Sequence, residues 1–150
     1  MMDALGMNEV MSIPTGFLVC DTMLKAAEVT LVSSGCVCAG KHYTVVSGEV
    51  AAVRAAVEAG REAASGVLVD SLVIANIEKS VAPAIMACTD TEHLKSVGVM
   101  ETYSVCAAIH AADAAAKAAD IRLLEVRLGR GLGGKSFVLL TGEVAAVTAA

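Results

Sequence analysis

The hexapeptide Gly48-Glu49-Val50-Ala51-Ala52-Val53 decides the fold, because it recurs without change 94 positions later, as residues 142–147. A perfect repeat of this kind in a chain of 150 residues indicates an internal duplication. Gly40-Lys41 matches Gly134-Lys135 at the same spacing. The chain is therefore expected to hold two similar domains, rather than the single domain that its length suggests.

The duplication extends toward the N-terminus at a slightly smaller spacing of 92 residues. Identical pairs at that spacing include Gly6 with Gly98, Glu9 with Glu101, Asp21 with Asp113, Lys25 with Lys117, Ala27 with Ala119 and Leu31 with Leu123. The later copy has gained two residues, and the glycine-rich stretch 129–133 is where a loop would absorb them. Nothing in the later copy matches residues 57–85, so the second domain is expected to lack its last helix and strand, as in a truncated chain.

Residue patterns in the first copy predict the order strand, helix, strand, strand, helix, strand. Strands are expected over 4–11, 29–33, 42–47 and 67–77, the last of them buried. One helix should begin near Pro14 and run to about Ala26, and a second, amphipathic helix should span 50–64. Residues 34–40 are typical of a tight exposed loop, 80–86 of a short helix and 89–95 of a polar connector.

This β-α-β-β-α-β order is typical of an α+β, ferredoxin-like domain, in which an antiparallel sheet carries both helices on one face. The first domain is expected over 4–88, the connector over 89–95 and the second domain over 96–150. With two Phe, two Tyr and no Trp, the cores must be packed from Ala, Val, Leu, Ile and Met.

Composition and charge exclude several classes of protein. The chain is 56% hydrophobic and 18% charged, so its surface is expected to meet other copies. No apolar run reaches the roughly 18 residues of a membrane helix, and no basic residue precedes Lys25, so neither a membrane span nor a secretory signal is expected. The net charge of -5 and the lack of a Lys/Arg cluster argue against nucleic acid as a partner. A cytoplasmic location follows, in which the five cysteines are thiols or ligands rather than disulfides.

Several separated motifs agree in order and spacing along the chain. The second copy contains Gly98-Val99-Met100-Glu101, the helical stretch 111–119 (AADAAAKAA) and Gly142-Glu143-Val144, and the first copy keeps Asp21, Lys25, Ala26 and Ala27. Further motifs are 69–77 (VDSLVIANI), Ser80-Val81 with Pro83-Ala84, Glu101-Thr102 with Ser104-Val105, and the glycine-rich 131–135. Together they resemble the tandem bacterial microcompartment shell proteins, and in particular the T-type branch of propanediol-utilisation compartments.

The resemblance implies a structural protein rather than an enzyme. It implies a homotrimer of tandem chains, a flat pseudo-hexameric tile that packs against other shell proteins around encapsulated enzymes, redox enzymes among them. Lys25 and Lys117 are then expected at the tile edge, although an i,i+4 surface pair with Asp21 and Asp113 would also explain them. The residues themselves offer no nucleophile-base pair and no two carboxylates placed for acid-base work.

The resemblance also implies a metal centre at the central pore. In T-type proteins a Cys-Pro-Gly-Lys loop brings one cysteine from each of three chains to a shared iron-sulfur cluster, and here the loop is Cys38-Ala39-Gly40-Lys41. Three thiolates leave one iron of a [4Fe-4S] cluster without a protein ligand, which suits electron transfer across the shell. Cys38 is the expected metal ligand, and the expected pore-lining residues are Cys36, Cys38, Ala39, Gly40, Arg130, Gly131, Leu132 and Gly133.

Other interpretations stay open at this stage. Cys36 is either an extra ligand or a small residue at the base of the loop, whereas Cys20, Cys88 and Cys106 lack a His or second Cys at metal spacing. The glycine-rich loop 129–134 is weak as a nucleotide site, since no helix is expected to follow it. Alternative functions are a cluster-free metabolite pore and a trimeric regulator that binds a small molecule at subunit clefts.

Overall fold

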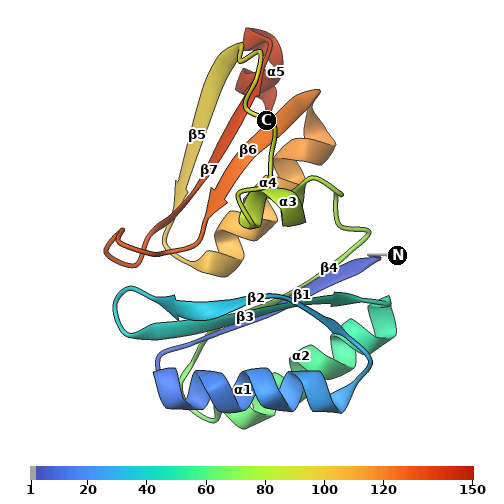
Figure 1. The fold of residues 1–150 in the computed structure, drawn as a ribbon, viewed down its shortest axis with the longest axis vertical. Helices are drawn as coiled ribbons and strands as arrows, with labels where there is room; N and C mark the ends of the chain where they lie inside the picture. Colours follow the sequence, from blue (N-terminus) through green and yellow to red (C-terminus); the bar gives the residue numbers. More distant parts are fainter. Residues whose placement is uncertain (1–2) are drawn as a thin grey trace. The chain divides into compact units, whose positions relative to one another are not determined.

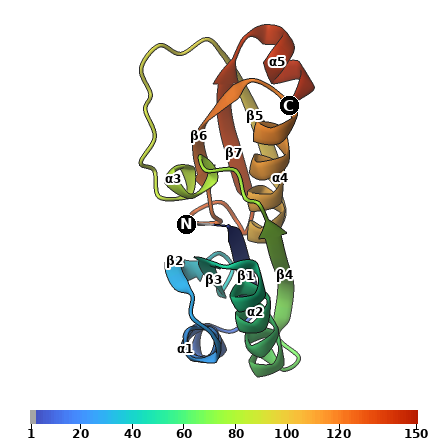
Figure 2. The same ribbon diagram turned by 90° about the vertical axis from the view of Figure 1, so that its right-hand side faces the viewer.

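The computed structural model describes residues 3–150, which divide into two compact units, one ending at Ile77 and one spanning Glu78–Ala150. The expected first domain extended to residue 88. However, α3 (Val81–Ile85) packs on β6 (Ile121–Arg127) and α4 (Val105–Ala118), and so belongs to the second unit. Figure 2 shows α3 beside β6, with the connector looping out before the next strand begins.

The first unit is a four-stranded antiparallel sheet with two helices on one face (Figure 1). Its strands are β1 (Ala4–Val10), β2 (Thr30–Val37), β3 (Lys41–Gly48) and β4 (Leu68–Ala75), in the order β2-β3-β1-β4. α1 (Ile13–Ala26) and α2 (Val50–Ala64) pack on each other and on this sheet. The predicted β-α-β-β-α-β order and α+β class are confirmed.

Local sequence explains where α1 begins and which face of α2 is buried. The Ser12 side chain accepts a hydrogen bond from the backbone N–H of Thr15, and Pro14 follows in the first turn, where its missing N–H costs nothing. In α2, the buried residues recur every three to four positions and face the sheet: Val53, Ala56, Val57, Gly60 and Ala64. This periodicity confirms the predicted amphipathic helix.

The second unit repeats three of the four strands. β5 (Ser96–Thr102), β6 and β7 (Ser136–Gly142) form an antiparallel sheet in the order β5-β7-β6, which corresponds to β1-β3-β2. α4 corresponds to α1, and the short α5 (Val144–Ala149) corresponds to the start of α2. Within the described residues β5 pairs with β7 alone, so this sheet has no counterpart of β4.

The hairpin between β2 and β3 differs from the expected exposed loop over 34–40. Strand β2 continues to Val37, because residues 34–36 pair with residues 42–44 of β3. Only residues 38–40 form the turn. These small residues have a weak preference for strands, but their backbone hydrogen bonds to β3 outweigh it. Such pairing is a tertiary effect and cannot be predicted from local sequence.

The prediction of a buried strand over 67–77 is wrong in its burial. β4 lies at the edge of the sheet and pairs only with β1. Leu68 and Val69 are exposed, whereas Ile74 is buried. An apolar run of this length is compatible with a central or an edge strand, and only the strand order distinguishes the two.

Candidate functional site

The turn between β2 and β3 carries the expected metal ligand. Cys38 is half-buried at the start of the turn, followed by exposed Ala39 and Gly40. Gly40 has a φ of +77°, a conformation that glycine adopts without strain. Cys36 is also exposed, but it lies inside β2 opposite His42 and is held by the ladder. The continuous extended segment that would set both cysteines on one side ends before Cys38.

The corresponding turn of the second unit joins β6 to β7 and holds the other expected pore-lining residues. Arg130, Gly131 and Gly133 are exposed, and Leu132 is half-buried. Glycines 129, 131, 133 and 134 have φ values between +56° and +92°, which explains the glycine content of this turn. Strand β7 follows directly, so no helix N-terminus is available for a nucleotide phosphate. Apart from Cys36, which lies in β2, the two sets of expected pore-lining residues therefore lie at equivalent hairpin turns.

A single chain does not provide a multi-ligand metal centre within residues 3–150, where no three His, Cys, Asp or Glu side chains gather around one point. Cys20 is half-buried on α1, Cys106 is buried on α4 and Cys88 is exposed after α3. An iron-sulfur cluster needs several thiolates. A single turn thiol such as Cys38 fits that requirement only where several copies of the chain converge.

The expected edge lysines each form the i,i+4 ion pair that their spacing predicts. Lys25 Nζ lies 2.7 Å from an Asp21 carboxylate oxygen, and Lys117 Nζ lies 2.7 Å from Asp113. The second pair is the better anchored, because Asp113 is buried and also accepts a hydrogen bond from the backbone N–H of Glu78 at 2.8 Å. Both ammonium groups remain largely exposed at the last turn of their helices.

Sequence reasoning did not single out the side of the sheet that faces away from α1 and α2, here called the sheet face. A Cβ on Gly6 would touch side chains of α2, so the alternation of β1 sends Leu5, Met7 and Glu9 to the sheet face. All three are 0% exposed. The part of the sheet face that β1 contributes in the first copy is therefore buried.

The second copy of the sheet face is exposed. Its residues on β5 are Val97, Val99 and Glu101, which correspond to Leu5, Met7 and Glu9 at the spacing of 92. Val97 is 51% exposed and Val99 is 64% exposed. Equivalent apolar side chains thus lie in opposite environments in the two copies.

The outer side of the first helix of each copy, here called the helix face, shows the reverse pattern. In the first copy Ile13 is 38% and Phe17 is 64% exposed. Their counterparts on α4, Val105 and Ile109, are both 0% exposed. Within residues 3–150, the exposed surfaces of these two kinds are therefore the sheet face of the second copy and the helix face of the first. The alignment at spacing 92 pairs apolar with apolar residues at these positions. This agreement is the signal from which the two faces could have been predicted as packing surfaces.

His42 lies directly beneath the first helix face. It is 1% exposed, its ring centroid lies 5.0 Å from that of Phe17, and Gly16 leaves room for it on α1. Burial lowers the pKa of His42, because the charged imidazolium would lose its hydration. Its Nδ1 has no hydrogen-bond partner within the described residues, and neither has Oγ of Ser136, its counterpart in the second copy. Neither of these two buried atoms therefore contributes a hydrogen bond to the fold within residues 3–150.

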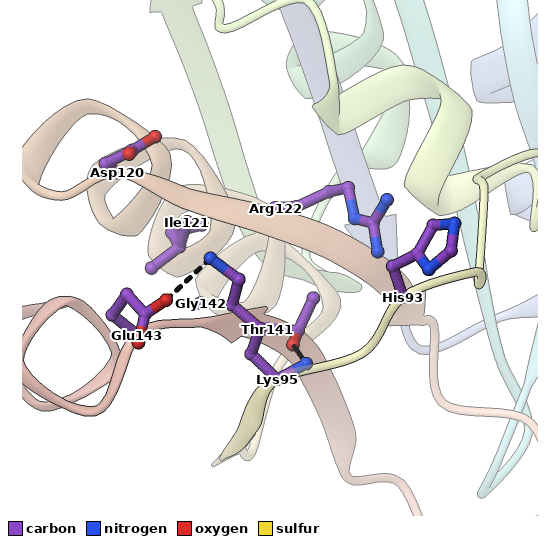
Figure 3. A pocket seen from close by; sticks show the side chains of 8 residues that line it. All are labelled: His93, Lys95, Asp120, Ile121, Arg122, Thr141, Gly142 and Glu143. Atoms are coloured by element: carbon purple, nitrogen blue, oxygen red, sulfur yellow. Dashed lines mark hydrogen bonds and ion pairs between the residues drawn. The ribbon is translucent and has the colours of Figure 1, made fainter.

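A cavity of about 260 Å³ lies in the second unit where the connector meets the ends of β6 and β7 (Figure 3). Lys95 and Glu143 face each other across it, with Nζ 2.6 Å from the carboxylate oxygen. The backbone N–H of Lys95 donates to Thr141 Oγ1 at 3.0 Å, and Arg122 donates to the backbone carbonyl of Glu92. Most polar groups of the cavity therefore fasten the connector to the sheet.

Comparison with known proteins places this geometry in a family. The model of the BMC domain matches residues 4–77 and again 96–150. The bacterial microcompartment shell protein PduT of Citrobacter freundii is 42% identical over 147 residues, which cover 98% of this chain and 80% of the relative. The carboxysome assembly protein CcmO of Synechocystis is 34% identical over 144 residues, covering 86% of this chain and 48% of the relative.

A solved structure agrees with the sequence relatives. A microcompartment protein from Desulfitobacterium hafniense DCB superposes with a TM-score of 0.91 at 43% identity, covering 99% of this chain and 82% of that one. Within residues 3–150 the structure contains no helix long and apolar enough to span a bilayer. PduT is a microcompartment shell protein, and this chain is likewise a shell protein rather than an enzyme. The chain belongs to the BMC domain family, with two tandem copies of the domain in a PduT-type microcompartment shell protein.

Proposed function

We propose that three chains close into a pseudo-hexameric tile of a microcompartment shell in the bacterial cytoplasm. In this tile the exposed sheet face of each chain packs on the exposed helix face of the next chain. The observation that carries the proposal is the opposite burial of the duplicated surfaces. Each chain exposes one sheet face, with Val97 and Val99, and one helix face, with Ile13 and Phe17. A heterologous contact between two different surfaces closes into a three-membered ring when each chain is rotated by a third of a turn from the one before it.

Physical chemistry favours covering both surfaces. Contiguous exposed apolar side chains are unusual on a monomer and typical of an interface. Burying them removes apolar area from water at about 25 cal/mol per Å². Because the counterparts of all four side chains are already buried elsewhere in the same chain, their shapes suit a packed environment. The number three is proposed from the family resemblance, and three chains with two domains each would give six similar wedges.

Replacing Phe17 by Asp should weaken this assembly at least about tenfold, because the carboxylate would be buried without a partner. Sedimentation velocity at micromolar concentration should show a trimer for the parent chain and smaller species for Phe17→Asp. The matched control is Leu18→Asp. Leu18 is also exposed, but its counterpart His110 is exposed as well, so this position should lie outside the interface.

A monomeric parent chain at micromolar concentration would contradict the proposed tile. Equal dissociation of Phe17→Asp and Leu18→Asp would instead show that the helix face is not the interface. Circular dichroism of both variants verifies that the units remain folded.

The proposal includes an iron-sulfur cluster at the ring axis, held by Cys38 from three chains. The turn position of Cys38 and its partial exposure support a shared site, and residues 3–150 of one chain hold no complete ligand set of their own. Such a cluster would supply one-electron transfer, with one iron left for a ligand from outside the protein. Ala39 replaces the proline of the family loop but leaves Cys38 and Gly40 in place. Iron and sulfide determination on anaerobically purified protein, with a visible spectrum, tests for the cluster.

The edge contact between tiles is proposed for Lys25 and Lys117. Replacing both by Ala should leave the trimer intact and reduce the formation of extended sheets, because a small loss repeats at every tile contact. The exposed Lys25–Asp21 pair that the change also removes contributes only about 0.2–0.5 kcal/mol. Loss of Lys117 costs more stability, because the buried Asp113 carboxylate then keeps only its hydrogen bond from the backbone N–H of Glu78. Electron microscopy of sheets formed at equal protein concentration measures the effect. If the double variant forms sheets as readily as the parent, these lysines do not lie at the tile contact.

A further inference from the structure

One ion pair occurs twice in the chain, in two different environments. In the first copy Lys41 Nζ lies 2.5 Å from Glu9 Oε1, with side chains 8% and 0% exposed. In the second copy Lys135 Nζ lies 2.7 Å from Glu101 Oε1, with side chains 42% and 59% exposed. The geometry is thus formed in both copies, and only the surroundings differ.

The exposed pair lies within the uncovered sheet face. Glu101 is on β5 in line with Val97 and Val99, and Lys135 immediately precedes β7, the partner of β5. Lys135 Nζ also lies 5.6 Å from the ring centroid of Tyr103, which is 83% exposed. The hydrogen bond to Glu101 raises the pKa of Lys135, which favours the charged ammonium group.

We infer that the Glu101–Lys135 pair determines the specificity of the contact with a second copy of this chain: it becomes buried on docking, as Glu9–Lys41 is buried in the first copy. This inference rests on the proposed ring. Its physical basis is the cost of burying one charge alone, which is far greater than the cost of burying a hydrogen-bonded pair. The contacting surface is the apolar helix face around Ile13 and Phe17, and the nearest charges along α1, Asp21 and Lys25, are already paired with each other at 2.7 Å.

Two single variants and one exchange test the inference. Glu101→Gln leaves Lys135 charged, and Lys135→Met leaves Glu101 charged, so each should weaken association at least about 30-fold. Exchanging the two charges, Glu101→Lys with Lys135→Glu, keeps a pair and should restore association to within about tenfold of the parent. Both positions are exposed in the isolated chain, so the variants should fold.

The Lys95–Glu143 pair provides the matched control. Its two charged atoms lie 2.6 Å apart and its side chains are exposed, and Glu49, the counterpart of Glu143, is exposed in the first copy as well. Glu143→Gln should therefore change association by less than about threefold.

Sedimentation equilibrium over a range of chain concentrations measures each association constant. If the parent chain does not self-associate, the proposed ring itself fails. If the parent forms trimers and Glu101→Gln has the same association constant as Glu143→Gln, the proposed ring is supported but the specificity role of the Glu101–Lys135 pair is wrong. Failure of the charge exchange to recover association beyond the single variants would also overturn it.

Discussion

Cys38→Ser is expected to remove all cluster iron, from about four atoms per trimer to background. Each chain contributes only one thiolate to the proposed site, so a single substitution removes all three protein ligands from the ring at once. Serine has nearly the same volume and Cys38 lies in a turn, so the fold and the trimer should persist. Iron and sulfide content after anaerobic purification, together with the trimer mass, measures the result.

Cys36→Ser is the matched control for this experiment. Cys36 is an exposed thiol two residues earlier, but it lies within β2 rather than in the turn. Its replacement should leave most of the iron in place. Equal iron content in the parent and Cys38→Ser proteins would exclude Cys38 as the ligand and favour a cluster-free pore.

Gly16→Ala is expected to destabilise the chain by about 3 kcal/mol. The added Cβ would lie 2.3 Å from both Cβ and Cγ of His42 and 2.6 Å from its Nδ1. His42 is 1% exposed and its Cβ is fixed to β3, so α1 has to move away from the sheet. Helix propensity alone predicts the opposite sign, since alanine stabilises a helix interior by about 1 kcal/mol over glycine.

Urea unfolding at a fixed chain concentration measures whether Gly16→Ala lowers or raises the free energy of unfolding. In a His42→Gly background the clashing atoms are absent, so Gly16→Ala should there be neutral or stabilising. This reversal isolates the contact, as in a double-mutant cycle. The second copy contains Ala108 and Ser136 at these positions, which indicates that the fold accepts a larger helix residue where the strand residue is smaller. A stabilising Gly16→Ala in the parent chain would contradict the argument.

Much of the fold was predictable because it depends on local patterns. Ser12 and Pro14 mark the start of α1, the spacing of Val53 and Val57 marks the buried side of α2, and the repeated hexapeptide reveals the duplication. The turn position of Cys38 was also predictable, although not the length of the strand before it. That strand length depends on pairing with β3, which no local pattern reports.

The sequence by itself determined two copies of one domain, the order of their strands and helices, and the family to which they belong. It also determined that each copy contains the same apolar and charged side chains on its sheet face and helix face. Which copy of each surface is buried follows from tertiary packing and cannot be read from either copy alone. Glu9–Lys41 and Glu101–Lys135 are equivalent in sequence and in geometry, yet the first pair is buried and the second is exposed. The physical reason is that local structure follows from neighbouring residues, whereas burial depends on groups that come from far along the chain or from another chain.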